Sequence, residues 1–260
     1  MPPTGSGISV RHERVGTVDW SDGGYSDQQL IQRVEKCLPE LFERLHVEDG
    51  SAECSVNLSG NKLRGAAPIA SILRSLRENQ VQVTTIRLHK NQFTDDAMSA
   101  LVEHIDRAAS DNRPLTELHL SDNRLTEDGI RSLVKAAHRC KAYSKGDAPP
   151  PRNGGRVRSF WLRTENQQPP VPDPHGVLER LAADGYSVCL LPSKEYQPQG
   201  ASARKSLEAP VHMHHAFAPR SELRASPEPA WGKGEAGWRK GEATSSRDWW
   251  AEGGKGKDGK

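Results

Sequence analysis

The sequence is poor in apolar residues and has no long apolar run. Hydrophobic residues make up 34% of its 260 positions, and no stretch approaches the roughly 18 apolar residues that a membrane helix needs. Residues 1–16 lack the apolar core of a signal peptide. We therefore expect an intracellular protein with no membrane segment, in the cytoplasm, with the nucleus as an open alternative.

The chain also lacks an excess of charge of one sign and a cysteine cluster. Lys and Arg number 36 against 34 acidic residues, a net charge of +2, which is too balanced to predict nucleic-acid or membrane binding from charge alone. The four cysteines form no C-x-x-C pair and indicate buried thiols in a reducing compartment: Cys37, Cys54, Cys140 and Cys189.

Motifs of catalysis are missing too. The sequence contains no phosphate-binding G-x-x-x-x-G-K-[ST] loop, no H-E-x-x-H and no nucleophile elbow. The stretch His212-Met213-His214-His215 could bind a transition metal weakly, but it has no further ligands nearby, so a solvated histidine tract is expected instead. We expect no enzyme activity, no cofactor and no metal.

What the sequence does contain is a repeat. Residues 56–63 (VNLSGNKL), 86–93 (IRLHKNQF) and 118–125 (LHLSDNRL) share the frame apolar-x-Leu-x-x-Asn-x-apolar. Apolar residues at helical spacing follow each copy. An asparagine amide both donates and accepts, so Asn61, Asn91 and Asn123 are predicted to join the turns of adjacent copies.

Further elements are predicted on both sides of these copies. A helix over 26–45 begins at Ser26 or Asp27, and Pro39 is expected to kink or divide it. A degraded fourth copy spans 157–167, with Val157, Phe160 and Leu162 aligned to Leu115, Leu118 and Leu120. Its asparagine, Asn166, is displaced by one place, and Glu165 occupies the expected slot. A short helix near 176–183 and a last strand over 186–191 follow.

The third copy resembles a leucine-rich repeat of the ribonuclease-inhibitor-like type. That type has the pattern L-x-x-L-x-L-x-x-N-x-L followed by a helix with an early glycine, matched here by Leu115, Leu118, Leu120, Asn123, Leu125 and Gly129. The other copies depart from it: Ala67 and Ala97 replace the glycine, and Phe93 replaces a leucine. The resemblance covers residues 54–191. It implies a short, curved α/β solenoid with parallel strands on the concave face and helices on the convex face, and usually a binding role.

These elements predict a domain layout. Residues 1–25 are expected to be a flexible N-terminal segment. Residues 26–193 are expected to form the leucine-rich repeat domain with an N-terminal helical cap and repeats near 54–82, 83–114, 115–156 and 157–193. Residues 194–260 are predicted to be a disordered tail, since only five Val, Leu, Ile, Met or Phe residues occur from position 201 onward.

Side chains of a strand alternate between two faces, which predicts a binding surface. With the leucines buried, the residues between them point outward, and we expect a concave-face patch of Arg87, His89, Glu117, His119, Trp161 and Arg163. Arg and Trp are enriched at the centres of protein interfaces. Two alternatives stay open: an ordinary solvated sheet face, or a Trp161 covered by the Pro-rich connections.

The tail supports a second hypothesis. Trp231, Trp238, Trp249 and Trp250 are interleaved with Gly and Lys or Arg, as in flexible tails that hold single-stranded nucleic acid weakly. A peptide motif that docks on a protein, or a plain tail, fits the same composition. The leading hypothesis is a non-enzymatic adaptor or scaffold whose concave face binds another protein; the alternative is an RNA-associated protein that uses the tail.

Overall fold

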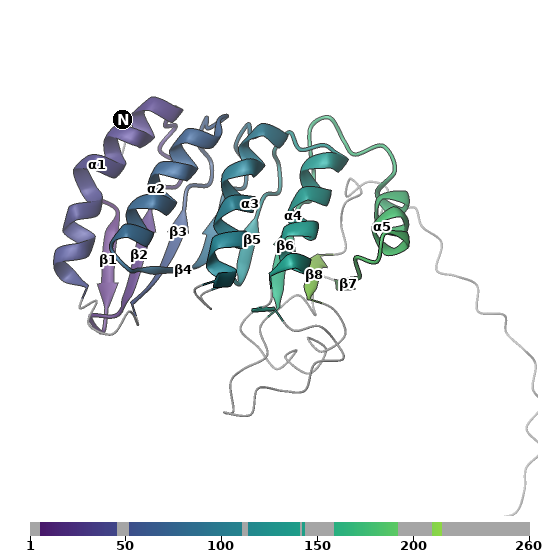
Figure 1. The fold of residues 1–260 in the computed structure, drawn as a ribbon. Helices are drawn as coiled ribbons and strands as arrows, with labels where there is room; N and C mark the ends of the chain where they lie inside the picture. Colours follow the sequence, from purple (N-terminus) through teal and green to yellow (C-terminus); the bar gives the residue numbers. More distant parts are fainter. Residues whose placement is uncertain are drawn as a thin grey trace, which may run out of the picture. The chain divides into compact units, whose positions relative to one another are not determined.

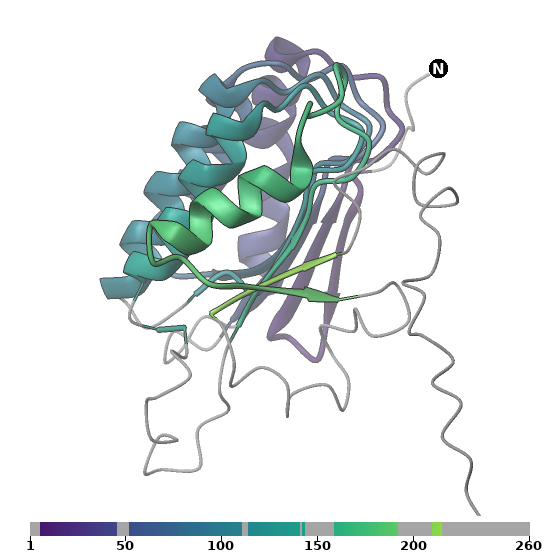
Figure 2. The same ribbon diagram turned by 90° about the vertical axis from the view of Figure 1, so that its right-hand side faces the viewer.

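A computed structural model describes residues 6–45, 52–110, 114–140, 142–143, 159–191 and 210–214. In it a layer of helices covers one face of an eight-stranded sheet (Figures 1 and 2). The strands are β1 (Ile8–Arg11), β2 (Val15–Asp19), β3 (Glu53–Asn57), β4 (Gln82–Arg87), β5 (Glu117–His119), β6 (Phe160–Arg163), β7 (Val188–Leu191) and β8 (Val211–His214). The helices are α1 (Asp27–Arg44), α2 (Ala66–Glu78), α3 (Asp95–Ser110), α4 (Glu127–Arg139) and α5 (Pro174–Ala183).

The sheet is parallel apart from one pair. Its strand order is β1-β2-β3-β4-β5-β6-β8-β7, and only β1 and β2 run antiparallel. Equivalent apolar residues of the repeats lie opposite one another: Val56 pairs with Ile86, Ile86 with Leu118, and Leu118 with Leu162. The α/β architecture with stacked parallel strands agrees with the prediction, and the curvature of the array stays a prediction.

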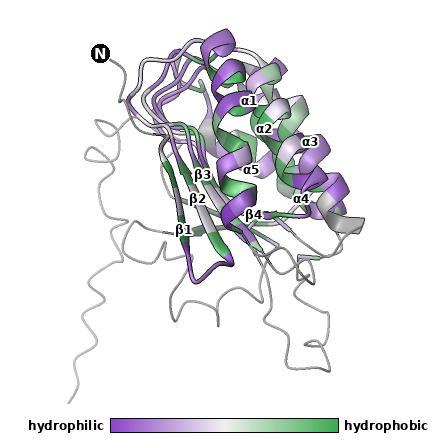
Figure 3. Ribbon diagram, turned by 90° about the vertical axis from the view of Figure 1, so that its left-hand side faces the viewer, coloured by the Kyte–Doolittle hydropathy of each residue, from purple (hydrophilic) through white to green (hydrophobic). Residues whose placement is uncertain are grey.

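The helices form where the apolar spacing predicts them. Ser26 caps α1 through a capping box with Gln29, and Thr126 caps α4 by accepting from Asp128 N. Figure 3 shows that each helix carries both hydrophobic and hydrophilic residues, and the apolar ones face the sheet in a shared core. Helix α1 continues through Pro39, which is exposed, so the predicted division of this helix is wrong.

The predicted flexible segment 1–25 needs correction. Residues 8–19 form a β-hairpin, and β2 pairs in parallel with β3. The hairpin leads into a further copy of the repeat frame, in which Val18 and Trp20 are buried like the leucines of later copies. Trp20 occupies the leucine slot and Gly23 the asparagine slot, so this copy departs from the frame apolar-x-Leu-x-x-Asn at two positions.

The register predicted for the fourth copy is wrong by two residues. Leu162 lies opposite Leu118, and Arg163 lies opposite His119, so Phe160 is not the equivalent of Leu118. The physical reason is that Thr164 takes the place of a leucine at the next buried position and is itself buried. A polar residue at that position hid the true alignment from the apolar pattern.

The prediction of a disordered tail over 194–260 is wrong for one described segment. Residues Val211–His214 form β8, which lies between β6 and β7. His212 is buried in this strand, which corrects the expectation of a solvated histidine tract. The predicted last strand is present as β7, at the edge of the sheet, and pairs with β8. The remainder of the predicted tail, including its four tryptophans, lies outside the described residues.

A candidate binding surface on the sheet

The turn after each strand is fixed by a buried amide. Asn123 donates from Nδ2 to Leu88 O and Leu120 O, both at 3.0 Å, and accepts at Oδ1 from Phe93 N at 3.1 Å. One side chain thereby satisfies backbone groups of its own repeat and of the preceding one. The structural role predicted for this asparagine is confirmed.

Asn61 and Asn91 make the same set of bonds in the preceding copies. In the fourth copy neither Asn166 nor Glu165 does so. Gln167 takes the role: it donates from Nε2 to Leu120 O at 2.9 Å and to Thr164 O at 3.0 Å, and accepts from Leu125 N at 2.9 Å. The amide chemistry is kept between repeats at the same spacing from the buried strand residue, five positions after Leu118 and after Leu162, although the residue type changes.

The residue before each of these amides, and before Gly23 in the first copy, has a positive φ, from 54° to 69°, at Asp22, Gly60, Lys90, Asp122 and Asn166. The backbone N–H groups of the first four donate across the repeats, for example from Lys90 N to Ser121 O at 3.0 Å and from Asp122 N to Glu165 O at 2.8 Å. A left-handed residue followed by an amide is thus the recurring turn of this protein. These turns fix the ends of the strands on which the candidate site lies.

The structure brings the six predicted site residues together on the sheet face opposite the helices. Glu117 lies opposite Trp161, and His119 lies between Arg87 and Arg163. His89 follows β4 on the same face, and its ring centroid is 6.4 Å from that of His119. The sequence therefore predicted that these residues share one face, although it placed Trp161 beside His119 rather than beside Glu117. That this face binds a partner stays a prediction.

Two of the six are not available for contact. Glu117 is 6% exposed and Trp161 is 5% exposed. The Trp161 ring packs 4.7 Å from the His212 ring and also contacts Cys189. Trp161 is a covered residue, as the alternative interpretation had it, but its described contacts are with His212 of β8 and Cys189 of β7 and not with the Pro-rich connections. Its burial argues against a direct contact with a partner.

A chain of hydrogen bonds crosses β2, β3 and β4 on this face. Asn57 donates from Nδ2 to Asp19 Oδ1 at 3.2 Å, which fixes its Oδ1 as an acceptor for the Ser59 hydroxyl at 2.7 Å. The hydroxyl has only one hydrogen, so His89 Nδ1, 2.9 Å from Ser59 Oγ, must be the donor to Ser59. In the neutral imidazole, Nε2 of His89 is then an acceptor, and no group of the described residues bonds to it.

The neutral form of His89 is favoured. Burial is the largest cause that lowers its pKa, and the charge of His119 is the second. His89 therefore presents a hydrogen-bond acceptor rather than a cation at neutral pH.

Glu117 is ionised and bonded to His119. Its Oε1 lies 2.5 Å from His119 Nε2. Burial raises the pKa of Glu117, but the hydrogen bond from His119 and the charges of His119, Arg87 and Arg163 outweigh it and hold the pKa below its usual value. Since the carboxylate has no proton to give, His119 Nε2 is the donor.

A second set of hydrogen-bonded polar side chains lies at the β6 end of this surface. Arg163 donates to Glu165 Oε1 from Nε at 3.1 Å and from Nη2 at 2.8 Å, and Ser121 Oγ bonds to Glu165 Oε2. The Arg163 guanidinium is therefore paired with the Glu165 carboxylate. Arg87, in contrast, is exposed, and its guanidinium makes no hydrogen bond or ion pair with the described part of the chain.

Sequence reasoning missed several residues of this surface. Asp19 belonged to the segment expected to be flexible, and Gln167 and Glu165 were hidden by the register error. The stretch VDWSDGGY, residues 18–25, has the repeat spacing with glycine in the asparagine slot. A frame that allowed both tryptophan for leucine and glycine for asparagine would include this copy and Asp19.

The described residues can also be compared with the requirements of a metal site and of a membrane-spanning helix. They contain no group of three or more His, Cys, Asp or Glu side chains placed to hold a metal ion. None of the described helices has the length and apolar content needed to cross a bilayer.

The fold and the turns define a class of repeat protein in which strand–turn–helix units stack side by side. Residues 111–134, which include β5 and the start of α4, match a family model described as Leucine Rich repeat. This match supports a leucine-rich repeat protein and suggests a protein-interaction module. The comparison with curated proteins gives no match. The ribonuclease-inhibitor-like type stays a prediction from the sequence.

Proposed function

We propose that this chain is a non-enzymatic adaptor or scaffold, and that its partner is a protein which binds across β3, β4 and β5 with an acidic group on Arg87. The observation that carries the proposal is the exposed Arg87 guanidinium. It lies between two hydrogen-bonded pairs of side chains, Ser59 with His89 and Glu117 with His119. A guanidinium offers paired donors that match a carboxylate. His89 Nε2 supplies an acceptor beside it.

The hydrogen bonds support a binding role over a catalytic one. In nucleophilic catalysis a serine hydroxyl donates its proton to a histidine base. Here the Ser59 hydroxyl donates to Asn57 and accepts from His89, which is the reverse arrangement. His119 is the donor to Glu117, and its ring is separated from His89 by 6.4 Å between centroids.

The test compares full-length variants. We expect Arg87→Glu to weaken binding of the partner by about tenfold or more, because charge reversal at an interface arginine removes its bonds and adds repulsion. Arg124→Glu is the matched control, since Arg124 is exposed on the loop after β5. Partners are captured after nuclease treatment and quantified by mass spectrometry for each variant.

A tail variant separates this proposal from the RNA alternative. Replacing Trp231, Trp238, Trp249 and Trp250 by alanine in the full chain should leave the nuclease-resistant partners bound. Equal recovery with Arg87→Glu and Arg124→Glu would contradict the proposal. Loss of partners only in the tail variant, together with their release by nuclease, would favour the RNA alternative.

A further inference from the structure

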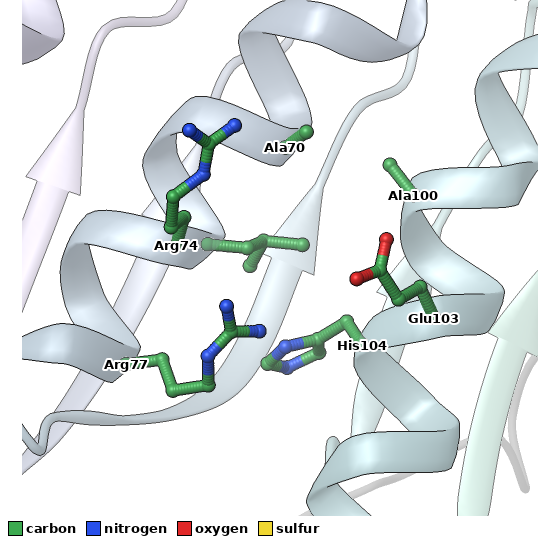
Figure 4. A pocket seen from close by; sticks show the side chains of 7 residues that line it. Ala70, Arg74, Arg77, Ala100, Glu103 and His104 are labelled. Carbon is green, nitrogen blue, oxygen red and sulfur yellow. The ribbon is translucent and has the colours of Figure 1, made fainter.

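The helical side of the protein contains a small polar cavity, on the layer opposite the candidate binding surface. It lies between α2 and α3 and has a volume of about 70 Å³, room for about two water molecules or one small oxyanion. Figure 4 shows side chains of both helices around it. The lining residues are Ala70, Leu73, Arg74, Arg77, Ala100, Glu103 and His104.

His104 has an unsatisfied atom at this cavity. The residue as a whole is partly exposed, but its Nε2 atom is buried and has no hydrogen-bond partner. Burial, with a smaller contribution from the charge of Arg77, lowers the pKa of His104 to about 4. The imidazole is therefore neutral at pH 7, and when its proton is on Nε2 this atom is a donor without an acceptor.

Two arginines face the same space. Figure 4 shows the Arg77 guanidinium beside the His104 ring, and Arg74 on the same helix one turn away. Neither guanidinium group makes a hydrogen bond or ion pair with the described residues. Each carries a planar set of N–H donors that matches the oxygens of phosphate better than a point charge does.

Glu103 is the one acidic group that lines the cavity, and it opposes an anion. Its carboxylate is bonded to Arg107 Nη2 at 2.6 Å, so part of its charge is offset by a residue of the same helix. The set that faces the cavity is then two unpaired arginines, one neutral imidazole donor and one paired carboxylate.

We propose that this cavity binds a phosphate-class oxyanion, held by the guanidinium groups of Arg74 and Arg77 and by the Nε2–H of His104. A tetrahedral dianion has enough acceptor oxygens for all three groups. Its source is either free phosphate or the phosphate group of a monoester, because both present the same oxygens to the cavity. The site is separate from the surface around Arg87 and does not depend on the function proposed there.

The test is an NMR titration of the ¹⁵N-labelled full chain at pH 7 and constant ionic strength. Inorganic phosphate, phenyl phosphate and acetate are added separately, and the imidazole signals of His104 are followed. We expect saturable shifts with phosphate and no saturation with acetate. Tighter binding of phenyl phosphate than of inorganic phosphate would identify the monoester as the source. The apparent pKa of His104 should rise in the presence of phosphate, because an anion stabilises the imidazolium.

Variants complete the test. Arg77→Ala should weaken phosphate binding at least tenfold, and Arg74→Ala should also weaken it. Arg44→Ala, which removes an exposed arginine from α1, should leave it unchanged. Circular dichroism confirms that each variant is folded. Shifts that do not saturate, that acetate reproduces, or that Arg77→Ala and Arg44→Ala change equally would overturn the proposal and leave a water-filled cavity.

Discussion

At the scale of single residues, Asn123 shows how one amide joins two repeats. It bonds to Leu88 O and Phe93 N of the preceding copy and to Leu120 O of its own. It is 1% exposed, so water cannot replace these bonds if the side chain is removed. The leucines around it provide burial, while the amide fixes the register of the turn.

We therefore predict that Asn123→Ala lowers the free energy of unfolding by about 3 kcal/mol, because buried backbone groups lose their partners. Asn79→Ala is the control: Asn79 is exposed at the end of α2 and bonds only to Ser75 O in its own helix, so its loss should cost less than about 1 kcal/mol. Urea denaturation measures both. Similar losses of free energy of unfolding for the two variants would show that the hydrogen bonds of the buried amide do not stabilise the turns.

At the scale of elements, the contact between α2 and α3 contains a group that should make stability depend on pH. The pKa of His104 is about 4 in the folded chain, against an ordinary value of 6.5. Between these values the unfolded chain binds the proton and the folded chain does not. The charged groups that line the cavity with His104 are Arg74 and Arg77 from α2 and Glu103 from α3.

The stability from a neutral His104 is complete above pH 6.5 and is lost as the pH falls towards 4. We expect this group to account for up to about 3 kcal/mol of the loss over that range. In His104→Gln the loss should be smaller by that amount, whereas in His175→Gln, which alters an exposed histidine of α5, it should equal the wild-type loss. Urea melts at several pH values measure this. An unchanged pH dependence in His104→Gln would refute the assignment.

The elements also show what could be predicted from the sequence. The central copies were clear because each places two apolar residues, an asparagine and a helical stripe at fixed spacing. The β1–β2 hairpin was missed because its strands have four and five residues, and because Trp20 and Gly23 after β2 replace the leucine and the asparagine of the frame. Strand β8 was missed because a four-residue segment joins the sheet through long-range pairing, which leaves no local pattern to detect.

The candidate site was predicted in part for the same reasons. Alternation along a strand placed Arg87, His89 and His119 on one face correctly. Burial of Glu117 and Trp161 depends on groups distant in sequence, including His212 of β8. The cavity between α2 and α3 likewise depends on how two helices pack, and no sequence motif marks Arg77 and His104 as neighbours.

At the scale of the whole molecule, the helical layer and the open face of the sheet differ in the side chains that they contain. The helices bury the apolar core and contain the His104 cavity. The opposite face of the sheet displays polar side chains that are bonded across strands, with Arg87 exposed among them. This arrangement, with the leucine-rich repeat match, is the basis for proposing that the sheet face binds a protein.

Site-specific photo-crosslinking tests that proposal most directly. A photoreactive residue at Ser55, which lies on β3 beside Thr85, should crosslink to a protein partner in the full chain, and Arg87→Glu should abolish the product. The same group at Ser99, exposed on α3, should give no such product. Crosslinks from Ser99 but not from Ser55, or crosslinks from Ser55 that persist in Arg87→Glu, would contradict binding through the sheet face.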